Sequence, residues 1–508
     1  MSRTSNTIRN IKFAMVGQML GILISLASRK VFVMFLSAEY LGLNGLFSNI
    51  LSMLALAELG VGAAIVYSLY KPIAEENFSE IKSIMRLYKT IYTTVGVFIL
   101  VAGCTLTPFL QFFIRDMPDI PNIRLIYLIY VVNSATSYFF TYKRSLIIAN
   151  QKWHIVTIYH YGLFFILNVA QMVVLWLTSN FIPYLLLQAA NTLLENILLS
   201  RKANRLYPFL RETNVPPLPC EIKAEIKRNV FAMIFHKVGG VIVFSTDNIL
   251  ISKLVGLTAV GIYSNYMMIR QALNTVTGLV FQSVSASFGN LNAQNSNKRT
   301  LEIFHIINFA GAWIFGFCSI CLIVLINPFI SLWLGNGYLF STSIVLWFSL
   351  AFYVSGMRTA CLAAREVMGL FWYDRYKPMF EVSINLIASV ILGRKFGVAG
   401  IMAGTVISTM TTCFWVEPLV LYRHGFHAPV SSFFIKYGTY TLITTIAGII
   451  TVMLCEFTHF SGITGFITKL VICAVVPNAI FALFYSKMDE FEYCFTTIKG
   501  SLKRHRRK

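Results

Sequence analysis

Charged residues are scarce in this chain. Only 12% of its 508 residues are Asp, Glu, Lys or Arg, whereas a soluble domain has about 25%. Acidic residues are scarcer than basic ones, since the chain has 21 Asp and Glu but 42 Lys and Arg. The formal charge of +21 would suggest nucleic acid in a soluble protein. Here the basic residues lie in short segments between apolar runs, so membrane topology and anionic lipid explain them and nucleic acid is not an expected partner.

Motifs for several kinds of chemistry are missing as well. The chain has no GxxxxGK[ST] phosphate-binding loop, so direct use of ATP is not expected. Its nine cysteines and eight histidines form no cluster with metal-ligand spacing, and Cys318 and Cys321 have no second pair nearby. We therefore expect no metal, no cofactor and no catalytic residue.

Long apolar runs fill the chain instead. Hydrophobic residues make up 56% of it, and segments of about 20 residues, the length that crosses a bilayer, recur from end to end. The pattern predicts an all-α integral membrane protein with about fourteen transmembrane helices. The predicted spans are 11–36, 41–69, 84–113, 123–149, 153–177, 181–204, 229–253, 257–288, 300–334, 341–368, 376–393, 398–421, 432–455 and 463–486.

Lys and Arg gather in every second loop. Since basic loops stay in the cytoplasm, this alternation predicts that both termini are cytoplasmic, in agreement with an even number of spans. Arg394 and Lys395 are the main exception, because the count places them outside.

Two halves of the chain are alike. Three pairs of short segments match at an offset of about 215–220 residues. They are EYLGLNGLFSN around Gly42 and TAVGIYSNYMM around Gly261, TPFLQFFI and NPFISLWL, and FILNVAQ and SINLIAS. A proline-rich polar segment separates the halves. We predict two six-helix repeats in parallel orientation, a design that places substrate at the repeat interface. The predicted parts are an N-terminal lobe at 1–205, a cytoplasmic linker at 206–228, a C-terminal lobe at 229–425, helices 13 and 14 at 426–486, and a basic cytoplasmic tail at 487–508.

Two stretches resemble a known family. SRKVFVMFLSAEYLGLNGLFSNILSMLALAELGVGAAIVYSLYKPIAEEN and GLFWYDRYKPMFEVSINLIASVILGRKFGVAGIMAGTVIS look like bacterial polysaccharide-export proteins, the O-antigen and repeat-unit flippases. Their superfamily also contains lipid II flippases and multidrug and toxic compound extrusion transporters. The resemblance implies two six-helix lobes around a central cavity, two added helices, alternating access, and a polyprenyl-pyrophosphate-linked oligosaccharide as cargo in the bacterial inner membrane.

Such a cargo needs a cationic path for its pyrophosphate, and cations inside apolar spans are the candidates. Arg29 and Lys30 stand together in ILISLASRKVFVMFL, where Arg29 shares a helical stripe with Gln18 and Ser25. Both side chains could line the cavity, or both could extend to the outer membrane interface.

Arg270 lies about thirteen residues into its predicted span, too deep to reach the interface easily. Its planar fork can bond two pyrophosphate oxygens at once, and in lipid II flippases arginines on helices 1 and 8 line the cavity, the helices that carry Arg29 and Arg270 here. A structural salt bridge is the alternative. Arg358, nearer the cytoplasmic end of its span and on one face with Ser355 and Arg365, could receive the pyrophosphate first or could simply reflect the cytoplasmic excess of cations.

Two acidic residues are candidates for coupling or gating. Asp247 aligns with Arg29 within one residue at the repeat offset. The two could form a salt bridge that closes the cavity, Asp247 could bind a proton or sodium ion, or the pair could be static. Glu58 lies on a small, polar stripe of its span that faces either the cavity or another helix.

We predict a flippase for lipid-linked glycan units, which needs no covalent catalysis. Anionic lipids at the cytoplasmic surface, H+ or Na+ as coupling ion, and polysaccharide polymerase machinery are possible partners. A multidrug exporter of the same fold is the first alternative, although cationic drugs would favour an acidic cavity. A membrane-bound polymerase or ligase is the second, although the external loops look too short for a catalytic domain.

Overall fold

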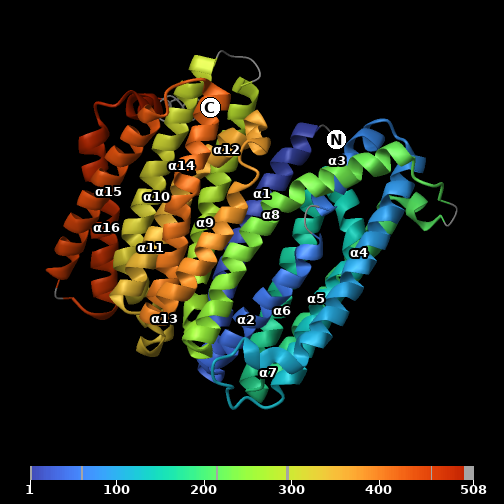
Figure 1. Ribbon diagram of the computed structural model, residues 1–508. Coiled ribbons are helices and arrows are strands. Elements are labelled where there is room, and N and C mark those ends of the chain that lie inside the picture. The colour runs from blue at the N-terminus through green and yellow to red at the C-terminus, as the bar shows by residue number, and fades with distance from the viewer. Residues whose placement is uncertain (1–2, 59–60, 213–214, 293–296, 459, 497–508) are drawn as a thin grey trace. The chain divides into compact units, whose positions relative to one another are not determined.

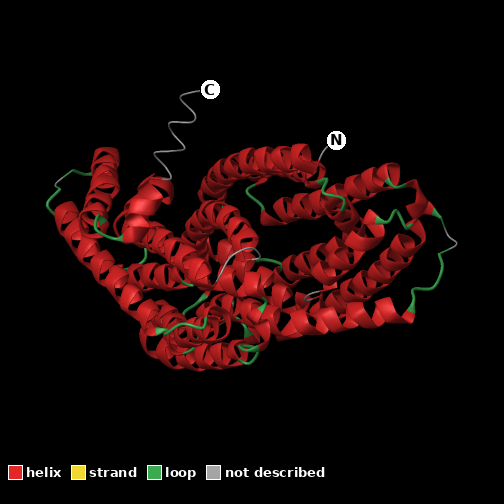
Figure 2. Cartoon of the chain, turned by 90° about the horizontal axis from the view of Figure 1, so that it is seen from above, coloured by secondary structure: helices red, strands yellow, loops and turns green. Residues whose placement is uncertain are grey.

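The chain is helical wherever its structure is described. A computed structural model describes residues 3–58, 61–212, 215–292, 297–458 and 460–496, and all regular structure in these ranges is helix (Figures 1 and 2). The predicted all-α class is confirmed. The chain forms two compact units, Met1–Gly261 and Ile262–Lys508.

The first unit contains eight of the described α-helices and the start of a ninth. α1 packs against α6, and α5 packs against both α4 and α7. Buried aliphatic and aromatic side chains fill two cores between these helices. The helices are α1 (Arg3–Phe35), α2 (Ala38–Leu54), α3 (Val61–Ala74), α4 (Phe78–Leu106), α5 (Ile123–Ala149), α6 (Trp153–Thr178), α7 (Phe181–Leu206), α8 (Cys220–Leu254) and the first turns of α9 (Leu257–Asn292).

Gly42 and Gly261, the glycines that align between the two halves of the sequence, lie against one another. A Cβ atom at Gly42 would come within 2.1 Å of the Leu257 carbonyl oxygen, and one at Gly261 within 1.9 Å of the Ala38 carbonyl oxygen. Only glycine permits so close a backbone approach. The start of α2 and the start of α9 therefore meet through the matched positions.

The second unit consists of the rest of α9 and seven further α-helices among the described residues. α10 packs against α11, α15 and α16, and α11 packs against α13 (Figure 1). The helices are α10 (Asn297–Leu334), α11 (Thr342–Met357), α12 (Thr359–Met368), α13 (Lys377–Thr411), α14 (Cys413–Val420), α15 (Ser431–Glu456) and α16 (Gly462–Tyr485).

Ten segments of the described chain are long and apolar enough to cross a membrane, which makes this a multi-pass membrane protein. One of them, Lys377–Phe426, has 50 residues, and a straight helix of that length would measure about 75 Å, more than twice the hydrocarbon thickness. It folds back at Gly397, whose φ of 59° breaks the helix. Across the turn Asn385 Nδ2 donates to Thr405 Oγ1 at 3.2 Å. The separately predicted spans 376–393 and 398–421 are the two arms of this hairpin.

Two other predicted spans are interrupted in the structure. The predicted span 41–69 is divided into α2, a 3₁₀ turn at Ala55–Glu58, and α3. The predicted span 341–368 is divided into α11 and α12, with Arg358 at the junction. Both breaks occur at a charged residue that the sequence had singled out, so each charge has backbone groups beside it that a continuous helix would use internally.

Candidate functional site

Glu58 ends the 3₁₀ turn between α2 and α3 and is held by tyrosines. The Tyr92 hydroxyl on α4 donates to Oε1 of Glu58, and the Tyr138 hydroxyl on α5 donates to Oε2 at 3.4 Å. Gly62 makes room for this arrangement, because a Cβ there would lie 2.8 Å from the Tyr92 oxygen. The carboxylate is half-buried. The two phenolic donors bind its oxygens and hold it in place.

Arg29 is half-buried on α1 in the same unit. Its electrostatic neighbours are Tyr184 on α7 and Tyr130 on α5, and the Tyr130 hydroxyl donates to Asn44 Oδ1 of α2 at 2.9 Å. Lys30 is half-buried on the next position of α1. The electrostatic neighbours of the guanidinium thus include tyrosines from two other helices, α5 and α7.

Asp247 on α8 is 6% exposed. It follows two further buried polar residues, Ser245 and Thr246. A buried carboxylate inside an apolar segment is costly, which makes Asp247 a candidate functional residue. Its pairing with Arg29 stays a prediction.

Arg270 on α9 packs against side chains of α11 in the second unit. Its side chain is buried, and Nη2 donates to Ser355 Oγ at 3.4 Å. The guanidinium carbon lies 5.8 Å from the ring centroid of Phe348 and 6.0 Å from that of Phe352. Aromatic faces attract a desolvated cation by about 2 kcal/mol. The N–H donors of the guanidinium all point outward within its plane.

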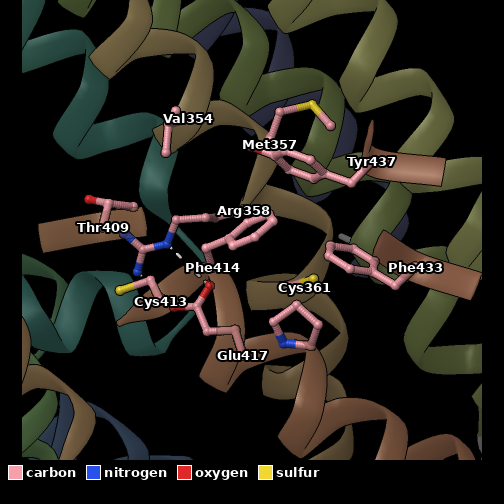
Figure 3. Close-up of a pocket in the computed structure, with 11 residues that line it drawn as sticks. Val354, Met357, Arg358, Cys361, Thr409, Cys413, Phe414, Glu417, Phe433 and Tyr437 are labelled. Atoms are coloured by element: carbon pink, nitrogen blue, oxygen red, sulfur yellow. Dashed lines mark hydrogen bonds and ion pairs between the residues drawn. The ribbon is translucent and has the colours of Figure 1, made fainter. Parts of the chain in front are cut away.

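Arg358 forms the centre of a buried ion-pair network (Figure 3). Its Nη2 donates to Glu417 Oε1 at 2.7 Å and its Nε to Glu417 Oε2 at 3.1 Å, so the two groups form a bidentate pair. Nη1 donates to Glu381 Oε1 at 3.3 Å. The side chain of Glu417 is 2% exposed and that of Arg358 is half-buried, so the carboxylate is removed from water and the pair anchors the α11–α12 junction to α13 and α14.

The network continues to the turn before α13. Lys377 Nζ also donates to Glu417, and it lies 3.7 Å from Asp374 Oδ2. Asp374 is fully buried and accepts from Arg365 of α12. Three cations and three carboxylates therefore balance in one place, as buried charges must if their desolvation is to be offset.

A small pocket adjoins Arg358 (Figure 3). Its cavity volume is about 10 Å³, which is the room of a single water molecule. Figure 3 shows Arg358 and Glu417 on one side and aromatic side chains on another. The pocket is too small for a sugar, so in this conformation it serves the ion pair rather than a glycan.

The sequence reasoning missed several of the charged groups that the structure brings together. Neither Asp374 nor Lys377 was singled out from the sequence, although their spacing of three suits a helix-start pair. A second cluster lies in the first unit, where Glu195 of α7 is 3.4 Å from Arg144 and 3.2 Å from His160 Nδ1. A lone acid within the predicted span 181–204 was the signal that could have indicated it.

The comparisons with known proteins connect this fold with membrane transporters. No family model and no curated protein matches the chain. Among solved structures, an inward-closed conformation of the lipid II flippase MurJ matches with a TM-score of 0.66 and 14% identity, over 94% of this chain and 99% of that one. An inward-facing multidrug resistance MATE transporter matches with a TM-score of 0.58 and 14% identity, over 82% and 99%. A mutant form of the Vibrio cholerae MATE transporter VcmN gives a TM-score of 0.56 and 11% identity, over 84% and 99%. At such identities the likeness shows the fold, and the chain has the fold that these transporters share.

Proposed function

We propose that this protein is a flippase that moves polyprenyl-pyrophosphate-linked oligosaccharide units across the bacterial inner membrane by alternating access, for O-antigen, capsule or exopolysaccharide synthesis. The observation that carries the proposal is the similarity to the MurJ flippase over nearly the whole length of both chains. The two stretches that resemble polysaccharide-export proteins support the glycan as cargo. The covalent structure of the cargo does not change, so no catalytic group is required.

Arg270 is the residue we propose to hold the pyrophosphate. Its guanidinium carbon lies within 6.0 Å of the ring centroids of Phe348 and Phe352, and one of its hydrogen bonds, to Ser355, is long at 3.4 Å. A pyrophosphate oxygen would offer a shorter, charge-assisted bond in place of that hydroxyl. Arg29 and Lys30 on α1 are the further cations that we propose to bind the substrate.

Arg358 is a weaker candidate for the same role. Its fork is already filled by Glu417 and Glu381, so a pyrophosphate would have to displace a carboxylate. We propose that Glu381, bound at 3.3 Å against 2.7 Å for Glu417, is the partner that gives way. The alternative role of Arg358 is to brace the α11–α12 junction.

We propose Glu58 and Asp247 as coupling or gating groups. Glu58 sits at an interrupted helix between two phenolic donors, and interrupted helices are where transporters commonly place ion and substrate sites. Protonation would remove the charge that its tyrosines bind, so a proton could loosen the α2–α3 break from α4 and α5. Asp247 would act by binding H+ or Na+, or by pairing with Arg29.

The cellular setting follows from the same proposal. Both termini would lie in the cytoplasm, where the basic linker and tail would meet anionic lipids. The polysaccharide polymerase machinery would receive the unit on the other side of the membrane.

Reconstituted vesicles test this function. Purified protein is placed in sealed vesicles with a fluorescent polyprenyl-pyrophosphate oligosaccharide, and a reagent that cannot cross the membrane reports how much of it reaches the other leaflet. We expect transfer above that of protein-free vesicles and of vesicles with an unrelated multi-pass protein. Transfer at the protein-free rate, with correctly folded protein, would contradict the proposal.

A multidrug exporter is the second candidate, because MATE transporters share the fold over 82% of this chain. Such a protein would lower the uptake of cationic dyes in cells or vesicles. We expect no dye transport, since a guanidinium in an aromatic slot repels a cation that approaches it. Dye export that Arg270→Ala leaves unchanged would favour this alternative.

A further inference from the structure

A short turn joins two membrane spans in the second unit and displays aromatic side chains. It covers residues 369–376, between the spans Thr342–Met368 and Lys377–Phe426. So short a connection keeps the turn at a membrane surface. Trp372 is 70% exposed and Tyr376 is 59% exposed, although Trp and Tyr side chains are usually buried for the most part.

The turn is anchored from within. Gly369 adopts a left-handed φ of 66° that ends α12. Asp374 is buried and paired with Arg365, and Lys377 reaches Glu417. Because the buried residues of the turn are held in the ion-pair network, the backbone of the turn is fixed. The exposed side chains of the same turn are therefore held at fixed positions.

Arg375 is the cation that this turn displays. Its guanidinium carbon lies 3.8 Å from the ring centroid of Trp372 and 4.7 Å from that of Tyr376. Nη1 donates to the Trp372 carbonyl oxygen and Nη2 to the Tyr376 hydroxyl, each at 3.4 Å. An arginine has five N–H donors in a planar fork, so these two bonds orient the group and leave donors for an anionic ligand.

A second basic segment adjoins the turn. Tyr373 stacks on His424 with ring centroids 3.9 Å apart and planes 10° apart. His424 belongs to the π-helical turn Leu421–Phe426, which ends the following span, and its neighbour Arg423 is exposed. The surface formed by Trp372, Tyr373, Arg375, Tyr376 and Arg423 is here called the aromatic–arginine surface. It has one cation, Arg375, against aromatic rings, and a second, Arg423, next in sequence to the stacked His424.

We propose that the aromatic–arginine surface binds the head group of an anionic phospholipid. Trp and Tyr rings prefer the head-group level of a bilayer, where one edge is apolar and the other wet. An arginine fork matches phosphate oxygens, and an anionic leaflet attracts basic residues close to its surface. The site is distinct from the glycan path proposed above. Lipid would bind there regardless of which cargo the protein transports.

Lipid binding by the purified protein tests the site. Protein in detergent is titrated with short-chain phosphatidylglycerol, and native mass spectrometry counts the lipids retained. Parallel titrations use phosphatidylcholine, whose head group contains a phosphate but has no net charge, and inorganic phosphate, which has no lipid chain. The variants are Arg375→Ala, Arg375→Lys and, as a control, Arg394→Ala, which removes an exposed arginine elsewhere in the second unit.

We expect wild type and Arg394→Ala to bind phosphatidylglycerol equally and more tightly than phosphatidylcholine. Arg375→Ala should bind it about fivefold more weakly, the usual contribution of one basic residue near a membrane surface. Arg375→Lys should fall between them, since it keeps the charge and loses the planar fork.

Three results would overturn the proposal. One is equal phosphatidylglycerol binding by wild type and Arg375→Ala, and another is an equal loss in Arg394→Ala. The third is inorganic phosphate competing with the lipid at equal concentration, which would make this a site for a soluble anion.

Discussion

Replacing Glu417 with alanine would remove the carboxylate on which two buried cations depend. Glu417 accepts two hydrogen bonds from Arg358 and a further one from Lys377. The side chain of Lys377 is 5% exposed and that of Arg358 is 20% exposed, so water cannot fully replace the lost partner. Breaking a buried pair in this way costs about 3–5 kcal/mol. The loss should lower the midpoint of thermal unfolding by about 6 °C or more for a unit of this size.

The midpoint is measured on purified protein in detergent, by the fraction that stays monodisperse after heating. Glu366→Gln is the control, because Glu366 is an exposed carboxylate on α12, beside the same network. We expect it to match wild type. The double variant Glu417→Ala/Arg358→Ala should lose less than the sum of the two single losses, since contacting partners are coupled. If Glu417→Ala unfolds at the wild-type temperature, or the two losses simply add, the network does not hold the α11–α12 junction.

Three smaller predictions follow from individual contacts. Tyr92→Phe removes the hydroxyl that donates to Glu58 and should cost about 1–3 kcal/mol, visible as a lower unfolding midpoint that Phe substitution of an exposed tyrosine does not cause. Gly404→Ala would bring a Cβ within 2.4–2.8 Å of the facing arm of the α13 hairpin, so the folded yield should fall, and a yield equal to wild type would show that the arms are not so closely packed. Burial acts to raise the pKa of Glu490, but the hydrogen bond and charge of Lys436 outweigh it, so the pKa lies below its ordinary value of 4.5. The stability that Glu490 contributes is then full above pH 4.5 and is lost as the pH falls below it. Glu490→Gln should therefore lower the midpoint more at pH 7 than at about pH 3.5, and equal effects at both would contradict the assignment.

The fold class could be predicted from the sequence because bilayer thickness makes each crossing a long apolar run. The apolar run at 41–69 does not show that the helix stops at Ala55–Glu58. The tyrosines that bind Glu58 at this break come from α4 and α5, far along the chain. The turn at Gly397 was predictable as a boundary between spans. The close contact of its two arms, seen at Asn385 and Thr405, is tertiary and has no local signal.

The candidate site was predictable only in part. An arginine within an apolar span is conspicuous in the sequence, so Arg270 and Arg358 could be identified as candidates. The partners were not found, because Arg270 lies among phenylalanines of α11, which any core could contain. Asp374 lies in a turn between two membrane spans, where charges are normally solvated, and only packing shows that it is buried.

We propose that an intramembrane arginine holds the pyrophosphate of a lipid-linked glycan, and this role of Arg270 can be measured through the translocation rates of its variants. Wild type, Arg270→Ala and Arg270→Lys are compared in sealed vesicles, with Arg124→Ala, an exposed arginine at the start of α5, as control. Each variant must first show wild-type folding in detergent. We expect Arg270→Ala to lose translocation, Arg270→Lys to keep part of it, because a point charge lacks the bidentate fork, and Arg124→Ala to behave as wild type. A folded Arg270→Ala variant that translocates the glycan at the wild-type rate would contradict the account.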